Sequence, residues 1–135
     1  MMIDSKVAKD FFERCKTEDA EEQRRCDRMS RIHNYYGSHL TDEYYDEAQF
    51  LTAAKKFLEM FEECLVVREA HGTKNGIADL LLCYRGRFVA AELKAIYGTP
   101  SANQHKFLEK VATAKGVGGI CTTLQDIWDL LNKAI

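Results

Sequence analysis

Three residues whose side chains can do metal chemistry flank an apolar stretch of this sequence: Asp79, Glu92 and Lys94. Carboxylate oxygens are the ligands that Mg²⁺ and Mn²⁺ prefer, and a nearby amine can orient a water molecule or stabilise developing negative charge. Charged groups inside otherwise apolar strands are costly to bury, so their presence calls for a chemical reason. The trio is therefore a candidate metal and catalytic site.

The spacing of the trio predicts that its members meet across a β-hairpin. Apolar runs at 77–84 and 87–96 are joined by an Arg-Gly dipeptide, a glycine-containing connection that suggests a tight turn. With those two residues as the turn, Asp79 lies directly opposite Glu92, with Cβ atoms roughly 5 Å apart, and Lys94 shares their face. A three-residue loop would shift the register and separate the acids.

The same residues also have an ordinary structural interpretation. A Glu-x-Lys at a strand end is usually a solvated pair, and an Asp after a glycine usually belongs to a turn. The neighbouring segments 80–82 and 88–91 favour the metal site, because strands as apolar as these are buried on both faces. Two opposed acids repel each other unless one holds a proton or both bind a cation. A divalent cation held in this way supports phosphodiester hydrolysis.

The order of these motifs resembles that of the PD-(D/E)xK nucleases, most closely the small virus-type VRR-NUC domains, over roughly residues 43–125. The family motif reads Gly-x-Pro-Asp, then Glu-x-Lys, then a Gln near the start of the following helix. Ala78 replaces the proline, which alters backbone stiffness and removes no ligand. The resemblance implies that Asp79, Glu92 and the Leu93 carbonyl bind the metal.

The resemblance also implies supporting roles for residues outside the hairpin. Lys94 would act on the attacking water, Gln104 would support the site, and an upstream helical acid would be Glu47, with Glu43 as the alternative. Gln104 has a structural interpretation as well, because Ser101 precedes it at capping-box spacing. The two roles can coexist at a helix N-terminus that points toward phosphate.

The distribution of charge is compatible with a nucleic-acid partner despite a net charge of −2. Residues 64–135 carry nine Lys and Arg against six Asp and Glu, whereas residues 1–63 carry ten against fifteen. The half that holds the trio is thus the basic half, as phosphate contact requires. The candidates for DNA phosphate contacts are Arg68, Lys74, Arg85, Arg87, Lys106 and Lys110.

The elements that would position the site predict an α/β chain of order αβββαβα. The expected architecture is a restriction-endonuclease-like core, in which helices flank a mixed sheet. Thr41 or Asp42 is expected to cap the first core helix. Besides the hairpin, the expected elements are a helix over 42–63, a strand over 65–70, a helix over 101–115, a strand over 118–122 and a helix over 124–133.

Residues 1–41 are expected to form an N-terminal helical extension to a nuclease core over 42–135, within one compact domain overall. Apolar residues at helical spacing predict helical segments over 4–18 and 19–35, and 33–40 resembles a loop with an aromatic pair. The apolar faces of these helices need a partner. They would pack on the core or form a dimer arm.

The composition excludes several other classes of protein. No apolar stretch approaches the roughly 20 residues that cross a bilayer, and the N-terminus lacks a signal-peptide core. The five cysteines are scattered and never form Cys-x-x-Cys, which argues against zinc and disulfide frameworks. We therefore expect an intracellular protein with no membrane contact, from the cytoplasm of a bacterial or virus-infected cell.

Two functional hypotheses follow. The first is a Mg²⁺- or Mn²⁺-dependent DNA endonuclease that hydrolyses phosphodiester bonds with an activated water. The resemblance implies a structure-selective enzyme acting on Holliday junctions or other branched DNA, as a homodimer because two symmetric incisions require two sites. The second is a catalytically inactive nucleic-acid-binding or protein-interaction module on the same fold. The intact acid, acid, lysine trio favours the enzyme.

Overall fold

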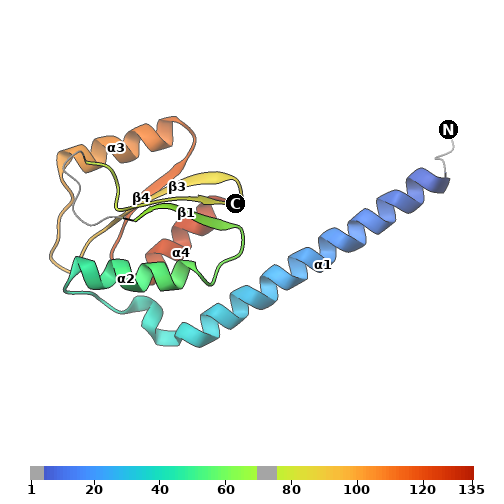
Figure 1. Cartoon of the computed structure of the whole chain (residues 1–135), viewed down its shortest axis with the longest axis horizontal. Helices are drawn as coiled ribbons and strands as arrows, with labels where there is room; N and C mark the ends of the chain where they lie inside the picture. Colours follow the sequence, from blue (N-terminus) through green and yellow to red (C-terminus); the bar gives the residue numbers. More distant parts are fainter. Residues whose placement is uncertain (1–4, 70–75) are drawn as a thin grey trace. The chain divides into compact units, whose positions relative to one another are not determined.

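The structure, a computed structural model, describes residues 5–69 and 76–135 (Figure 1). By its internal contacts the chain divides into two compact units, with the boundary in the sequence between residues 35 and 36. The elements in chain order are α1 (Ser5–Tyr36), the 3₁₀ helix η1 (Gly37–Thr41), α2 (Glu47–Leu58), β1 (Cys64–Glu69), β2 (Leu80–Tyr84), β3 (Arg87–Leu93), α3 (Ala102–Thr113), β4 (Val117–Cys121) and α4 (Leu124–Lys133).

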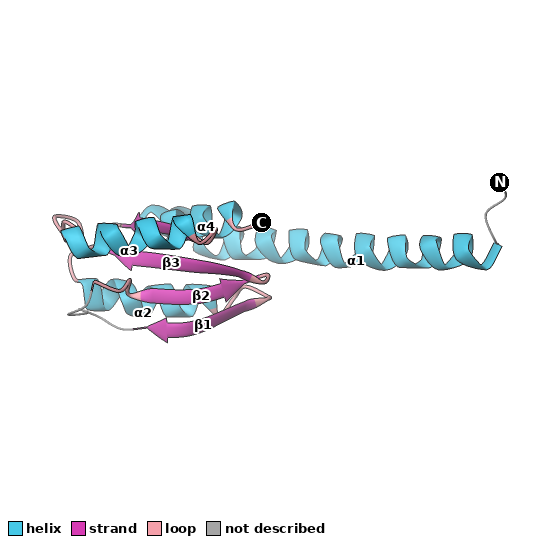
Figure 2. Ribbon diagram, turned by 90° about the horizontal axis from the view of Figure 1, so that it is seen from above, coloured by secondary structure: helices cyan, strands magenta, loops and turns pink. Residues whose placement is uncertain are grey.

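The second unit contains one four-stranded mixed sheet in the order β1-β2-β3-β4. Neighbouring strands are antiparallel from β1 to β3 (Figure 2). Strand β4 runs parallel to β3. Helix α3 lies on one face of the sheet, and α2 and α4 lie on the other (Figure 1). The α/β class, the element order and a mixed sheet flanked by helices are therefore as predicted.

The two faces of the sheet have different cores. On the α2 and α4 face, aromatic rings interlock: Phe61 contacts both Tyr84 of β2 and Trp128 of α4, at centroid distances of 6.2 and 5.4 Å. On the α3 face, the small residues Ala78 and Ala90 let Val111 of α3 approach closely. This face also carries the candidate site.

The hairpin forms in the predicted register. Ladder pairs run from Tyr84 opposite Arg87 to Leu80 opposite Ala91. The turn residues Arg85 and Gly86 have φ values of +53° and +85°. Two consecutive left-handed residues are the signature of a two-residue type I′ turn, so the alternative three-residue loop does not occur.

The N-terminal segment differs from expectation. A single helix, α1, replaces the two expected segments, and it continues through Tyr36 into η1 where a loop was expected. No glycine or proline interrupts residues 5–36. Ion pairs within α1, such as Arg25 to Glu22 at 3.0 Å, support the helix across its polar middle.

The start of α2 also differs. Neither Thr41 nor Asp42 caps this helix; Asp46 does, by accepting the backbone N–H of Ala48 at 2.8 Å. Asp42 instead lies 2.8 Å from the His39 ring. An Asp-x-Ala at the first turn satisfies a free helical N–H, and the earlier candidates are used by η1.

The bounds of the remaining strands and helices in the second unit agree with the prediction to within a few residues for most of these elements. The strands β1 and β4 and the helices α3 and α4 begin and end close to the predicted positions, and β3 stops at Leu93 rather than Ile96. All five cysteines are free thiols. Among the described residues, no helix combines the length and the apolar character that crossing a bilayer requires.

Candidate metal-binding and catalytic site

The hairpin brings Asp79 and Glu92 together at its open end. The last ladder pair is Leu80 with Ala91, so the two acids occupy the next position along both chains. A carboxylate oxygen of Asp79 accepts the backbone N–H of Leu93 at 2.9 Å, which ties the residue before β2 to the end of β3. Both acids are buried, Asp79 at 4% and Glu92 at 1% exposure.

Burial places the two carboxylates in electrostatic conflict. Desolvation is the main cause that raises the pKa of Glu92, to about 8, and the negative charge of Asp79 is the next. The Lys94 ammonium acts in the opposite direction. Without a cation, Glu92 therefore holds a proton near neutral pH, and a bound cation would displace that proton.

Lys94 lies between two carboxylates from different elements. Its Nζ is 3.5 Å from Glu92 Oε1 and 3.7 Å from Glu47 Oε1, and its side chain is only 11% exposed. Glu47 is the first residue of α2, whereas Glu43 is exposed in the segment before that helix. Of the two alternative helical acids, the structure thus brings Glu47, and not Glu43, beside the trio.

Two contacts that the sequence analysis did not predict hold this arrangement. The backbone N–H of Ile96 donates to the Tyr44 carbonyl at 2.8 Å, which ties the segment before α2 to the end of the hairpin. A Cβ at Gly98 would lie 3.2 Å from Glu47 Oε1 and 3.3 Å from Lys94 Cδ. The sequence signal for this close approach is a glycine two residues before Pro100.

Gln104 has both of the roles considered for it. Its side-chain oxygen accepts the Ser101 N–H at 2.7 Å, and its own N–H donates to Ser101 Oγ at 3.2 Å, which completes a capping box at the start of α3. Its side-chain amide then donates to Glu92 Oε1 at 2.6 Å. The cap therefore fixes the orientation of the amide that holds Glu92.

The second oxygen of Glu92 is the most informative atom of the site. Glu92 Oε2 is buried and has no hydrogen-bond partner among the described residues. A buried carboxylate oxygen left unsatisfied is rare and destabilising, so this atom needs either a proton shared with Asp79, which would form a hydrogen bond between the two acids, or a bound ligand. With Asp79 as neighbour, the missing ligand that fits best is a cation.

The donor set fits a hard divalent cation rather than zinc. Within residues 5–69 and 76–135, no group of three or more His, Cys, Asp and Glu side chains is placed to hold a metal ion of any kind, so the side-chain ligands available here are two carboxylates. Two carboxylates are what Mg²⁺ takes from proteins, together with waters and substrate oxygens. Asp79 and Glu92 would supply them, and the Leu93 carbonyl follows directly in the chain.

Gly76 positions the segment that delivers Asp79. Its φ is +72°, a left-handed conformation that glycine adopts without strain. A Cβ there would lie 2.6 Å from Asn103 Cβ and 2.9 Å from the Asn103 backbone carbon. The glycine therefore lets the chain before Asp79 touch the first turn of α3, one residue from Gln104.

Replacing Gly76 with alanine is expected to destabilise the protein by about 1–3 kcal/mol, because the new Cβ adds left-handed strain and a clash with backbone that cannot move freely. Gly86→Ala is the matched control: Gly86 is also left-handed, at φ +85°, but a Cβ there meets nothing within 4 Å. Urea unfolding of both variants measures the difference. Equal losses would show that the contact with Asn103 contributes nothing.

The raised pKa of Glu92 predicts how metal-free stability depends on pH. The folded state binds the Glu92 proton more tightly than the unfolded state, so the contribution of Glu92 to stability is greatest below about pH 4.5 and is lost as the pH rises toward about 8. Each pKa unit corresponds to about 1.4 kcal/mol. Thermal unfolding in EDTA across this range, in wild type and Glu92→Gln, measures the effect. Parallel curves for the two proteins would exclude it.

Two of the arginines proposed to contact DNA make contacts within the protein. Arg85 Nε lies 3.1 Å from a Glu63 carboxylate oxygen. Arg87 donates to the backbone carbonyls of Lys115 and Lys133, both at 3.2 Å, and so ties the start of β3 to the ends of two other elements. Both guanidinium groups have structural partners that local sequence did not reveal.

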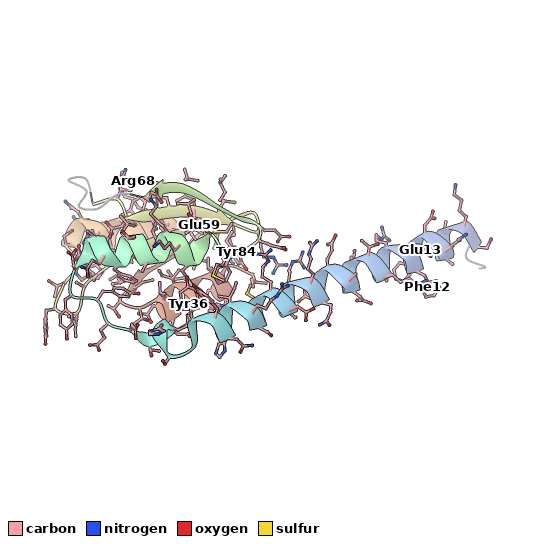
Figure 3. The ribbon with its side chains drawn as sticks, turned by 60° about the horizontal axis from the view of Figure 1, so that its bottom comes forward. Phe12, Glu13, Tyr36, Glu59, Arg68 and Tyr84 are labelled. Carbon is pink, nitrogen blue, oxygen red and sulfur yellow. The ribbon has the colours of Figure 1, made fainter. Side chains whose placement is uncertain are left out.

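The other four cationic candidates are distributed differently. Lys106 and Lys110 are exposed on α3, the helix that begins beside the acids. Arg68 belongs to the edge strand β1 (Figure 3), and its Nε is buried with no hydrogen-bond partner among the described residues. Lys74 lies outside the described residues.

Comparison with known proteins does not assign a function to this site. No protein-family model, no curated protein and no solved structure matches the chain. Its chemistry is therefore inferred from the residues themselves and their geometry.

Proposed function

We propose that this chain is a Mg²⁺- or Mn²⁺-dependent DNA endonuclease that hydrolyses phosphodiester bonds with water as the nucleophile. The observation that carries the proposal is the buried pair of Asp79 and Glu92, with Lys94 beside it and with one Glu92 carboxylate oxygen that has no partner among the described residues. The motif order and the αβββαβα arrangement support a restriction-endonuclease-like core of the PD-(D/E)xK type, most like a VRR-NUC domain.

Each residue of the site has a role in this proposal. Asp79, Glu92 and the Leu93 carbonyl would hold the cation. When bound, the cation would supply charge neutralisation at the phosphate and a lowered pKa for the attacking water. Lys94 would orient that water, since its ammonium stands 3.5 Å from Glu92.

The neighbouring residues keep these groups in place. Gln104 would hold Glu92 in one orientation through the 2.6 Å hydrogen bond. Glu47 would balance the charge of Lys94 from the start of α2, at 3.7 Å. Because both act through another side chain, they are positioning residues whose loss would impair cleavage less than loss of the acids.

The substrate proposed is DNA with a branched structure, such as a Holliday junction. Its support is the resemblance to small structure-selective nucleases, together with the basic side chains of Lys106 and Lys110 on the helix that begins at the site. Two symmetric incisions would require a homodimer. Light scattering of the protein with and without junction DNA would measure the mass, and a monomer in both conditions would count against this substrate.

A cleavage assay on plasmid and four-way-junction DNA tests the activity, with Mg²⁺, Mn²⁺ or EDTA present. Asp79→Asn is expected to abolish cleavage, because the amide keeps the shape of the side chain and loses the charge that attracts the cation. Glu43→Gln is the matched control and is expected to cleave like wild type, since Glu43 is exposed and makes no ion pair with Lys94.

The other outcomes of this assay separate the two functional hypotheses. DNA binding without cleavage in every metal tried would favour the inactive nucleic-acid-binding module. Cleavage that persists in EDTA, or equally in Asp79→Asn, would remove the metal site from the mechanism.

A further inference from the structure

A second feature of the α3 face lies at the other end of β3 from the acids. It is a cavity of about 270 Å³ between the start of β3 and the last turns of α3. The cavity is lined by Phe88, Phe107, Lys110, Val111, Ala114 and Gly116. Apart from the lysine, its walls are apolar, and two of them are aromatic rings.

The cavity and the acids share one face of the sheet. Phe88 and Glu92 are four residues apart on β3, so their side chains point the same way with about 13 Å between them. Helix α3 spans the same distance, from Gln104 beside the acids to Ala114 beside the cavity. A strand with its phosphate at the acids would reach the cavity within a few nucleotides.

The exposure of Phe88 indicates a ligand with a flat apolar surface. Its side chain is 42% exposed, which is unusual for a phenylalanine on an inner strand of a sheet. Its ladder partner is Cys83, whose own partner Leu65 is 65% exposed. Duplex DNA would present phosphates to this apolar strip, whereas an unpaired base would present a ring that stacks on an aromatic side chain.

The charge beside the cavity is complementary to a nucleic-acid backbone. Lys110 lies at the cavity and, with Lys106 and Glu109, also lines a second depression along α3. In the part of the chain that the structure describes, neither lysine makes an ion pair. Lysine side chains beside an aromatic cavity are the usual pairing in sites for single-stranded nucleic acid.

We propose that this cavity holds an unpaired nucleobase of the substrate strand. The enzyme would then take DNA in which the strand leaves the duplex close to the scissile phosphate. The inference rests on the proposed function for the identity of the substrate, and it adds the structural feature of DNA that is recognised.

The test uses a duplex with a single-stranded arm in which 2-aminopurine, a fluorescent base, occupies successive positions. Ca²⁺ replaces Mg²⁺ to measure binding without cleavage. Stacking on Phe88 is expected to quench one position in the unpaired arm. Phe88→Ala should abolish that quench and weaken binding roughly 5- to 100-fold, as loss of one stacked base does, whereas Phe88→Tyr should retain both.

Two controls make the result specific to the cavity. Leu65 belongs to the same row of the sheet as Cys83 and Phe88 but does not line the cavity. Leu65→Ala should therefore leave the quench unchanged. Lys110→Gln should weaken binding and reduce its dependence on salt without moving the quenched position. Quenching that is uniform along the arm, or equal in wild type and Phe88→Ala, would overturn the proposal.

The readout also separates this inference from the proposed function. A single quenched position that depends on Phe88, in a protein that cleaves nothing, would support the cavity and refute the endonuclease. Cleavage of fully paired and branched DNA at equal rates, with no quenched position, would support the endonuclease and refute the cavity as a site for an unpaired base. A fall in mass by light scattering for Phe88→Ala, without DNA, would assign the apolar strip to a second copy of the chain and overturn the proposal.

Discussion

Glu92→Gln is expected to make the metal-free protein more stable while it abolishes metal-dependent cleavage. The amide has the shape of the carboxylate and can still accept from Gln104, but it carries no charge to repel Asp79. Its NH₂ group would also stand where Glu92 Oε2 now lacks a partner among the described residues. Above about pH 8, where wild-type Glu92 is ionised, we expect a gain of about 1–3 kcal/mol.

Cleavage in Mg²⁺ should fall by about three orders of magnitude, because one of the two charged ligands of the cation is lost and a cation's transition-state stabilisation is worth several kcal/mol. Mg²⁺ should also raise the melting temperature of wild type and not of Glu92→Gln. The plasmid cleavage assay measures the first effect. Calorimetry at pH 5 and pH 9, with and without Mg²⁺, measures the melting temperatures. A variant that is less stable than wild type at pH 9 would show that Glu92 serves the fold rather than a cation.

The hairpin was predictable from sequence because its determinants are local. A period of two assigns faces, and the Arg-Gly turn sets a single register, so the opposition of Asp79 and Glu92 follows from counting. The capping box at Ser101 was predictable for the same reason, since it spans only one helical turn. Local patterns therefore defined the acids and the start of α3.

Contacts between distant segments were not predictable in this way. The approach of Gly76 to Asn103 and the tie between Tyr44 and Ile96 join segments far apart in the chain. The partners of Arg87, two backbone carbonyls from later elements, explain why a basic residue at a strand start is not a free phosphate ligand. Such contacts depend on tertiary packing, which a single sequence does not display.

The predicted start of α2 and the predicted division of the N-terminal helix were wrong for a related reason. Each predicted capping residue was plausible alone, but Asp42 and Asp46 both satisfy the local rule, and only the path of the chain selects Asp46. Helix α1 continues past its polar middle because charged residues there pair along the helix, so the absence of an apolar face did not end it. Local rules give candidates, and packing selects among them.

Lys94→Met is expected to reduce cleavage like Glu92→Gln and to change stability in the opposite direction. Methionine keeps the length of the buried stem and removes the ammonium that stands 3.5 Å from Glu92 and 3.7 Å from Glu47. Without that charge, the buried carboxylates of Asp79 and Glu92 repel each other more strongly, so metal-free stability should fall by about 1–3 kcal/mol at pH 9. At pH 5 the loss should be smaller, because Glu92 then holds a proton and needs less compensation.

The contrast between the two variants separates catalysis from stability. Lys56→Met, on an exposed position of α2, is the matched control and should alter neither property. In a Glu92→Gln background the lysine has lost one of its charged partners, so Lys94→Met should lower stability less than it does in wild type. A double-mutant cycle measures this difference as a coupling between the two residues. Additive effects, or cleavage by Lys94→Met at the wild-type rate, would show that Lys94 only fills space. A cleavage defect that appears in both variants, despite opposite changes in stability, can arise only from the chemistry of the site.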